Sequence, residues 1–161
     1  MLEELLKIIL MTVMPSVEAR AAVAYTVIFL KNTSPLIPLL LSLPTIIVGL
    51  IVYRLLDFLE QKIVNGLLSK IGFIRKMYFK YVVHVRNKSR RYVEKYGQIG
   101  LIVFIAIPLP GSGAWTGALV AKIFNIDFTK TVISIIVGVI LSSYISYVAS
   151  VLGISLVELI V

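Results

Sequence analysis

Glu18 and Arg20 are the only charged residues in an apolar stretch that runs from Ile8 to Leu30. Charge at membrane depth is costly and usually serves function, so both are candidates for chemistry. A carboxyl group there is suited to carrying a proton, and an arginine offers a forked set of donors to a phosphate or carboxylate. A helix that begins at Pro15 or Ser16 would add the free N–H groups of its first turn to an anion site. The alternative is that the two charges only neutralise each other.

A second candidate group lies in "PLPGSGAWTG", residues 108–117, inside an uncharged run over residues 96–121. Proline lacks a backbone N–H and glycine adopts positive φ, so the sequence predicts a broken helix here. Irregular backbone persists in hydrocarbon only when it is buried in protein or lines a wet cavity. Trp115 either anchors the chain at the membrane interface or forms a wall of that cavity. The candidate substrate-site residues of this break are Pro108, Pro110, Gly111, Ser112, Gly113, Trp115 and Thr116.

The elements that position these residues follow from hydropathy. A chain of 161 residues, 59% hydrophobic and with mean hydropathy +1.00, predicts an all-α integral membrane protein with a single membrane domain, 1–161. Long apolar runs predict full transmembrane helices at 32–56 and 129–157. Each broken segment, 1–31 and 96–125, is predicted to be a re-entrant hairpin that turns near the membrane midplane. Each half is then a hairpin plus one full span, and the single crossing inverts the second repeat relative to the first.

The segment between the two halves, residues 57–95, is strongly basic. Eleven of the 16 Lys and Arg residues lie between Arg54 and Lys95, which places this segment in the cytoplasm. Its apolar residues, Val85 among them, recur at three- and four-residue steps and predict amphipathic helices on the membrane surface. With re-entrant hairpins both termini lie outside; in the alternative, a bundle of four kinked helices, the termini share the cytoplasmic side. The candidates for binding anionic lipid, unless they only set topology, are Arg86, Lys88, Arg90 and Arg91.

The last apolar run carries small residues every four positions, which predicts close helix packing, with a polar conduit as the alternative. A shorter set lies in the first span at Ser42, Thr45 and Gly49. The members in the last run are Ser134, Gly138, Ser142, Ser146 and Ser150.

Several function classes are excluded by composition. The chain has no cysteine, and its one histidine, His84, cannot form a multi-histidine metal site. No nucleophile elbow, phosphate-binding loop or dinucleotide fingerprint is present, so we expect no enzyme activity, metal or cofactor. The basic residues are flanked by apolar spans, which argues against a nucleic-acid partner.

Two motifs, "MPSVEARAAVAY" and "IPLPGSGAWTGALVAK", resemble the family of putative small multidrug export proteins. More distantly, "EKYGQIGLIVFIAIPLPGSGAW" is similar to the second membrane-embedded motif of the DedA, or VTT-domain, superfamily. That similarity implies two facing re-entrant hairpins and the movement of lipids, including polyprenyl-phosphate carriers, with proton coupling in some members. Glu18 matches the acidic residue of the first hairpin, and Pro108, Pro110 and Gly111 match the break in the second. The superfamily's arginines near that break are absent, so Arg20 would have to supply the cation.

The sequence thus predicts a transporter or flippase in the cell membrane, working as a homodimer. It would move an amphipathic, anionic substrate, coupled to H⁺ through Glu18. One alternative is an exporter of cationic drugs with Glu18 as the counter-charge. The other is a non-transporting scaffold that shapes lipids through its basic helices.

Overall fold

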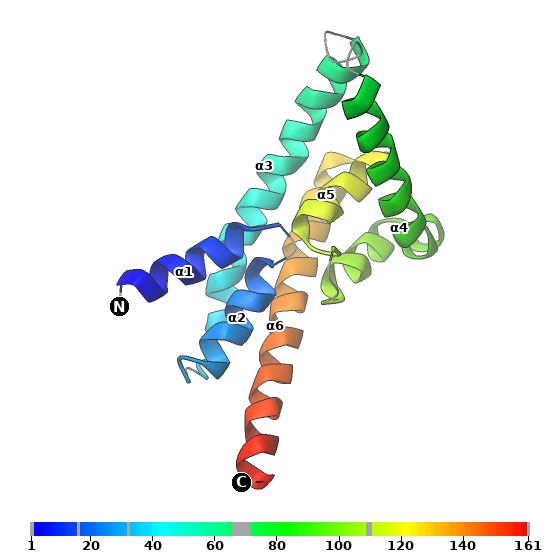
Figure 1. Ribbon diagram of the computed structural model, residues 1–161. Coiled ribbons are helices and arrows are strands. Elements are labelled where there is room, and N and C mark those ends of the chain that lie inside the picture. Colours follow the sequence, from blue (N-terminus) through cyan, green and yellow to red (C-terminus); the bar gives the residue numbers. More distant parts are fainter. Residues whose placement is uncertain (1, 16, 32, 66–71, 109–110, 161) are drawn as a thin grey trace.

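The computed structural model describes residues 2–15, 17–31, 33–65, 72–108 and 111–160, and these residues form helices joined by short connections. Among them there is no strand, so the predicted all-α class is confirmed. The helices are α1 (Leu2–Val13), α2 (Glu18–Ile28), α3 (Ile37–Asn65), α4 (Gly72–Ala106), α5 (Ala114–Ile123) and α6 (Phe128–Ile160) (Figure 1).

Two of these helices, α3 and α6, are long and apolar enough to cross a bilayer. Their apolar parts, Ile37–Leu56 and Phe128–Ser155, each have a mean hydropathy of 2.2. Both helices expose large apolar side chains at three- and four-residue steps, a pattern that suits contact with lipid rather than water. On α3 this stripe includes Leu39, Leu43, Ile47, Ile51 and Leu55, and on α6 it includes Ile133, Val137, Leu141, Ile145, Val148 and Leu152.

The remaining apolar helices form two broken pairs. The first pair is α1 and α2, with the break at residues 14–17. The second pair consists of residues 98–106, at the end of α4, and α5. These last residues of α4 are set apart from its basic part by Gly97, whose φ of 54° is a left-handed conformation that favours glycine.

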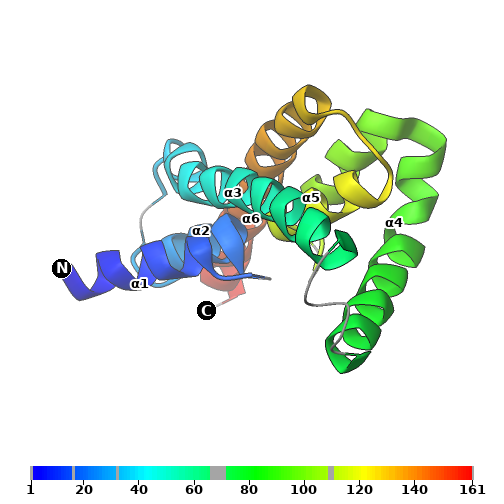
Figure 2. The ribbon, with the colours of Figure 1, turned by 90° about the horizontal axis from the view of Figure 1, so that it is seen from above.

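The two pairs lie on opposite sides of the crossing between α3 and α6 (Figure 2). Their breaks meet beside α6, near the middle of the long helices (Figure 1). From its break, α2 runs toward the C-terminal end of α6, whereas α5 runs toward the start of α6.

Helix α6 packs closely on the end of α4. A Cβ atom on Gly138 would lie 2.7 Å from Ile105 Cβ and 3.2 Å from the backbone oxygen of Ile102. Ile105 itself is fully buried in the hydrophobic core. Gly138 thus serves helix packing, as the four-residue spacing of small residues predicts.

The basic part of α4 turns one face toward the protein. Val85, Ser89 and Val93 recur every four residues and are all buried, with both valines in the hydrophobic core. At Val85 the predicted apolar face therefore packs on protein rather than on lipid. Arg90 is exposed, and its Nε lies 2.7 Å from Glu94 Oε2. Three other predicted lipid-binding side chains lie outside the described part of the structure: Arg86, Lys88 and Arg91.

Candidate functional site

The first break presents Glu18 at the start of α2. A helix start at Pro15 or Ser16 would have added free N–H groups to an anion site, but α2 begins at Glu18, and Ser16 lies outside the described residues. Glu18 has a φ of 56°, a conformation that costs a non-glycine residue about 1–3 kcal/mol and is typical of functional sites.

Thr45 of α3 closes the first break by joining its two ends. The backbone N–H of Ala19, in the first turn of α2, donates to Thr45 Oγ1 at 3.0 Å. The same hydroxyl donates to the carbonyl oxygen of Thr12, in the last turn of α1, at 2.7 Å. Helix ends leave such groups without partners inside the helix, and a membrane offers no water to bind them. One hydroxyl thereby satisfies a donor and an acceptor that the break exposes.

In the second break, Glu18 accepts hydrogen bonds from the free backbone N–H groups at the N-terminus of α5. Its carboxylate accepts hydrogen bonds from the backbone N–H of Ala114 (2.9 Å, to Oε2) and of Trp115 (3.5 Å, to Oε1). The preceding residue, Gly113, has no side chain that could cap the helix. A Cβ atom at Gly113 would overlap the Glu18 carboxylate, so only glycine admits this approach. The positive end of the α5 dipole also favours a negative charge here.

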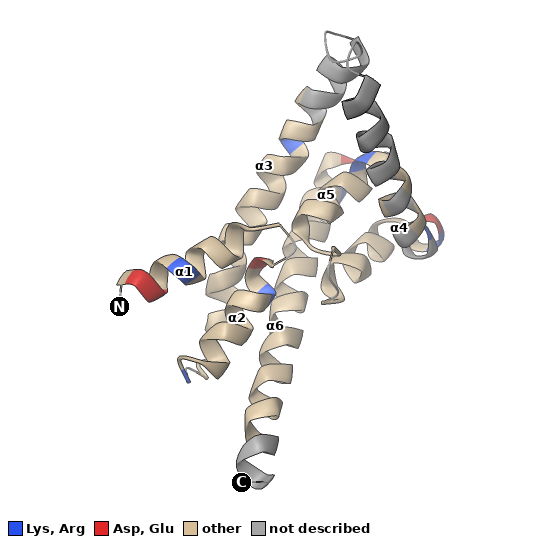
Figure 3. Ribbon diagram, in the orientation of Figure 1, with Lys and Arg blue, Asp and Glu red and all other residues tan. Residues whose placement is uncertain are grey.

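Arg20 joins α2 to the second break and to α6. Its Nη1 donates to Ser112 Oγ at 3.3 Å, and Ser112 Oγ donates to the carbonyl oxygen of Ile107 at 2.6 Å. The backbone oxygen of Arg20 accepts a hydrogen bond from Ser146 Oγ at 2.9 Å. Glu18 and Arg20 are only 4% and 8% exposed, so solvent screens the attraction between their opposite charges only weakly. Figure 3 shows one acidic and one basic position at the start of α2, beside the place where the two breaks meet, and further charged positions on α1 toward the N-terminus.

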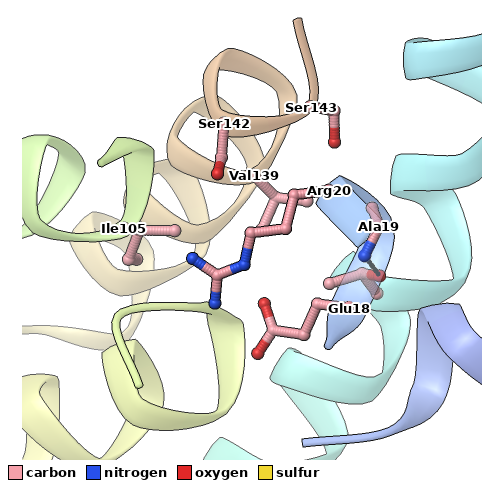
Figure 4. Close-up of a pocket in the computed structure, with 8 residues that line it drawn as sticks. Glu18, Ala19, Arg20, Ile105, Val139, Ser142 and Ser143 are labelled. Atoms are coloured by element: carbon pink, nitrogen blue, oxygen red, sulfur yellow. Dashed lines mark hydrogen bonds between the residues drawn. The ribbon is translucent and has the colours of Figure 1, made fainter. Parts of the chain in front are cut away.

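A small cavity lies beside this pair, with room for about one water molecule. The Glu18 carboxylate and the Arg20 guanidinium lie side by side (Figure 4). Ser142 and Ser143 of α6 lie across the cavity from Glu18, beyond the Arg20 side chain. The lining residues are Glu18, Ala19, Arg20, Thr45, Ile105, Val139, Ser142 and Ser143.

The structure thus brings Glu18, Arg20 and Ser112 together with the backbone of residues 113–115. Gly111 turns the chain with a φ of 75°. Trp115 is half-buried against the core, and its indole Nε1 has no partner among the described residues. Thr116 is buried within α5, Pro108 is exposed after α4, and Pro110 lies outside the described residues.

Several residues of the site were not among the predicted ones. Thr45 and Ser146 belong to small-residue sets that predict helix packing, so their spacing gave no sign of these contacts. Thr12 and Ser143 carry no sequence signal at all, because their roles depend on which helix packs against them. Within the described residues, no three His, Asp or Glu side chains cluster as metal ligands require.

Two long apolar helices with lipid-type faces, and a charged pair buried between them, define an all-helical membrane protein. Residues 18–145 match the model of the family described as "Putative small multi-drug export protein", and the chain belongs to this family. The predicted resemblance to the small multidrug export proteins is confirmed, although the match begins at Glu18 and leaves out α1 and the end of α6. The description of the family names export and no enzymatic activity. No curated protein and no solved structure matches the chain.

Proposed function

We propose that this protein is a secondary transporter of the cell membrane that moves an amphipathic, anionic substrate, coupled to H⁺ through Glu18. The family description supports export, and the observation that carries the finer proposal is the Glu18 carboxylate on the N-terminus of α5. This end of α5 already binds an oxyanion, which is supplied by the chain itself. Lipid phosphates, including polyprenyl phosphates, belong to the substrate class that the DedA-like motif implies.

Charge balance favours an anion over a cation as substrate. Arg20 and the positive end of α5 both face Glu18, so these two groups already balance its single negative charge. When Glu18 is neutral or displaced, the site has net positive character and attracts an anion. A cationic drug would instead have to separate Glu18 from both of these partners.

Proton coupling follows from competition for the same N–H groups. The ionised Glu18 carboxylate and a substrate oxyanion cannot occupy the N-terminus of α5 together. A protonated Glu18 carries no charge and holds these N–H groups less tightly, because hydrogen bonds to ionised acceptors are roughly twice as strong. Proton binding and anion binding therefore promote each other, as linkage requires.

The architecture we propose is an inverted pair of repeats, each a re-entrant hairpin and one full span. Two features support it: α2 and α5 run in opposite directions from breaks that meet, and polar side chains satisfy the broken backbone. Such breaks in corresponding positions of two halves are typical of transporter sites.

Two basic residues, Arg54 and Lys122, lie at one end of the bundle, and we place this end in the cytoplasm together with residues 57–95. The Arg54 guanidinium carbon lies 4.1 Å from the Phe128 ring centroid, and Lys122 Nζ lies 3.8 Å from that of Tyr53. These contacts hold the end of the apolar part of α3, the end of α5 and the start of α6 at one level. In this topology both termini lie outside. A homodimer completes the proposal, because so few helices can hardly shield a cavity alone.

Purified protein in liposomes tests the transport proposal. We expect wild-type protein to accelerate the movement of fluorescent phosphatidic acid between leaflets, followed by dithionite quenching, and to leave ethidium efflux unchanged. Glu18→Gln should abolish lipid movement without changing the thermal midpoint by more than a few degrees. The control is Glu3→Gln, because Glu3 is an exposed glutamate of α1. Ethidium efflux that depends on Glu18, without lipid movement, would instead identify an exporter of cationic drugs.

Single cysteines in this cysteine-free chain test the topology. We expect Leu2→Cys and Glu158→Cys to react with an impermeant maleimide from outside, and Asn87→Cys only after the membrane is opened. Reaction of all three from one side would establish the four-helix bundle and refute the re-entrant hairpins.

The surface of α4 offers a separate lipid contact, for which we propose Arg86, Lys88, Arg90 and Arg91. The exposed position of Arg90 supports it. A double substitution, Arg90→Ala with Arg91→Ala, should weaken binding to vesicles that contain phosphatidylserine. If the protein is a scaffold rather than a transporter, this variant alone should alter vesicle shape.

A further inference from the structure

Two serines of α6 lack the hydrogen bond that the other described serines of this helix make. Ser142 and Ser143 are 6% and 0% exposed, and neither hydroxyl has a partner among the described residues. The other hydroxyls each donate to a carbonyl oxygen: Ser134 to Lys130, Ser146 to Arg20, Ser150 to Ser146 and Ser155 to Val151. A buried hydroxyl without a partner is rare and destabilising, so the pair calls for a ligand.

Both hydroxyls line the cavity beside Glu18. Figure 4 shows them directed from α6 toward the side of the cavity where Glu18 and Arg20 lie. The space admits about one water molecule, and a buried water requires two to four polar partners. Ser142 and Ser143 supply two such partners from α6, and Glu18 and Arg20 line the same cavity from α2.

We propose that this cavity binds one water molecule, held by Ser142 and Ser143, which hydrates Glu18. This inference rests on the proposed function only for its role in transport, since the site itself follows from the cavity and the two hydroxyls. Ser142 and Ser143 are then positioning residues that act on Glu18 through the water. A water that hydrogen-bonds the ionised carboxylate stabilises the charged form, so its loss favours the neutral form.

The other groups around Glu18 do not titrate near neutral pH, so they do not mask a change in the protonation of Glu18. Arg20 is the one other charged residue that lines the cavity. The lining residues of α3, α4 and α6 are Thr45, Ile105, Val139 and the two serines, none of which ionises near neutral pH. Helix α5 contributes the backbone N–H groups of Ala114 and Trp115. A shift in the pH profile of transport would therefore report on Glu18.

Water-edited solid-state NMR on serine-labelled protein in bilayers tests the site without any transport measurement. We expect magnetisation from water to reach Ser142 and Ser143, and Ser143→Ala to lower the signal at Ser142 several-fold because the two share one water. Absence of the signal at both serines would overturn the proposal.

Thermal unfolding is a second test, because the direction in which the unfolding midpoint shifts distinguishes a cavity that holds water from a dry one. If the water is present, Ser142→Ala and Ser143→Ala remove one of its anchors and lower the unfolding midpoint by several degrees. If the cavity is dry, each change removes an unpaired hydroxyl, and the midpoint stays or rises, which would refute the site. Ser134→Ala is the control, because this buried serine already donates to the carbonyl oxygen of Lys130 at 2.7 Å and lies 3.5 Å from that of Gln98.

The role in transport is tested by the pH profile. Ser142→Ala should move the half-maximal pH of lipid movement upward, and Ser134→Ala should leave it in place. An unchanged midpoint in Ser142→Ala, with the NMR signal intact in wild-type protein, would refute the role while the water site stands. Lipid movement that is insensitive to Glu18→Gln would refute the proposed function and would leave the NMR result unaffected.

Discussion

Thr45→Val removes the hydroxyl that joins the two ends of the first break and keeps the shape of the side chain. The change leaves the N–H of Ala19 and the carbonyl of Thr12 buried without their partner. Each buried group left unsatisfied costs about 1–3 kcal/mol, and the added methyl group recovers less than about 1 kcal/mol. The two groups together therefore lower the expected free energy of unfolding by about 1–6 kcal/mol.

The measurement is an SDS titration in mixed micelles, followed by far-ultraviolet circular dichroism. Thr45→Ser, which keeps the hydroxyl, should recover most of the loss. Thr26→Val is the matched control, because Thr26 is also buried but donates to the carbonyl of Ala22 within its own helix at 2.8 Å. That carbonyl keeps its helical partner, so this change should cost less than about 1 kcal/mol.

The reasoning is refuted if Thr45→Val unfolds within about 0.5 kcal/mol of the wild type, or if it matches Thr26→Val. Either result would mean that the first break needs no side chain to satisfy its backbone. The claim that the break survives at membrane depth because Thr45 closes it would then be wrong.

Two further substitutions test glycines that other groups approach closely: Gly113, next to the Glu18 carboxylate, and Gly138, next to α4. Gly113→Ala should expel the Glu18 carboxylate from the N-terminus of α5 and abolish lipid movement as fully as Glu18→Gln does. Dithionite quenching measures this movement, and a variant that retains it would contradict the close approach of Glu18 to Gly113. Gly138→Ala should lower the free energy of unfolding by about 1–3 kcal/mol, because its Cβ meets Ile105 and the backbone of α4. On the same helix, Gly153→Ala meets nothing within 4 Å and should be neutral or stabilising by up to about 1 kcal/mol, so equal effects of the two changes would exclude the packing argument.

Much of the helical framework could be predicted from sequence. Helices are interrupted within both predicted broken segments, 1–31 and 96–125: α1 ends at Val13 before Pro15, and α5 begins at Ala114 after Gly113, because proline and glycine end helices locally. The start of α3 could not be placed as well. It begins at Ile37 rather than at residue 32, since an apolar run shows membrane compatibility but not where the backbone becomes helical.

What the sequence determined by itself is the class of protein and the candidate charges. Hydropathy indicates a membrane protein, and Glu18 and Arg20 stand out because they are the only charged residues in a long apolar stretch. Only the tertiary structure decided what these residues bind. Glu18 reaches backbone N–H groups 96 and 97 positions away, and Ser142 and Ser143 lack partners only because of what packs beside α6. Hydropathy and helix breaks are local properties of the chain, whereas the partner of a buried polar group is set by which helices pack together.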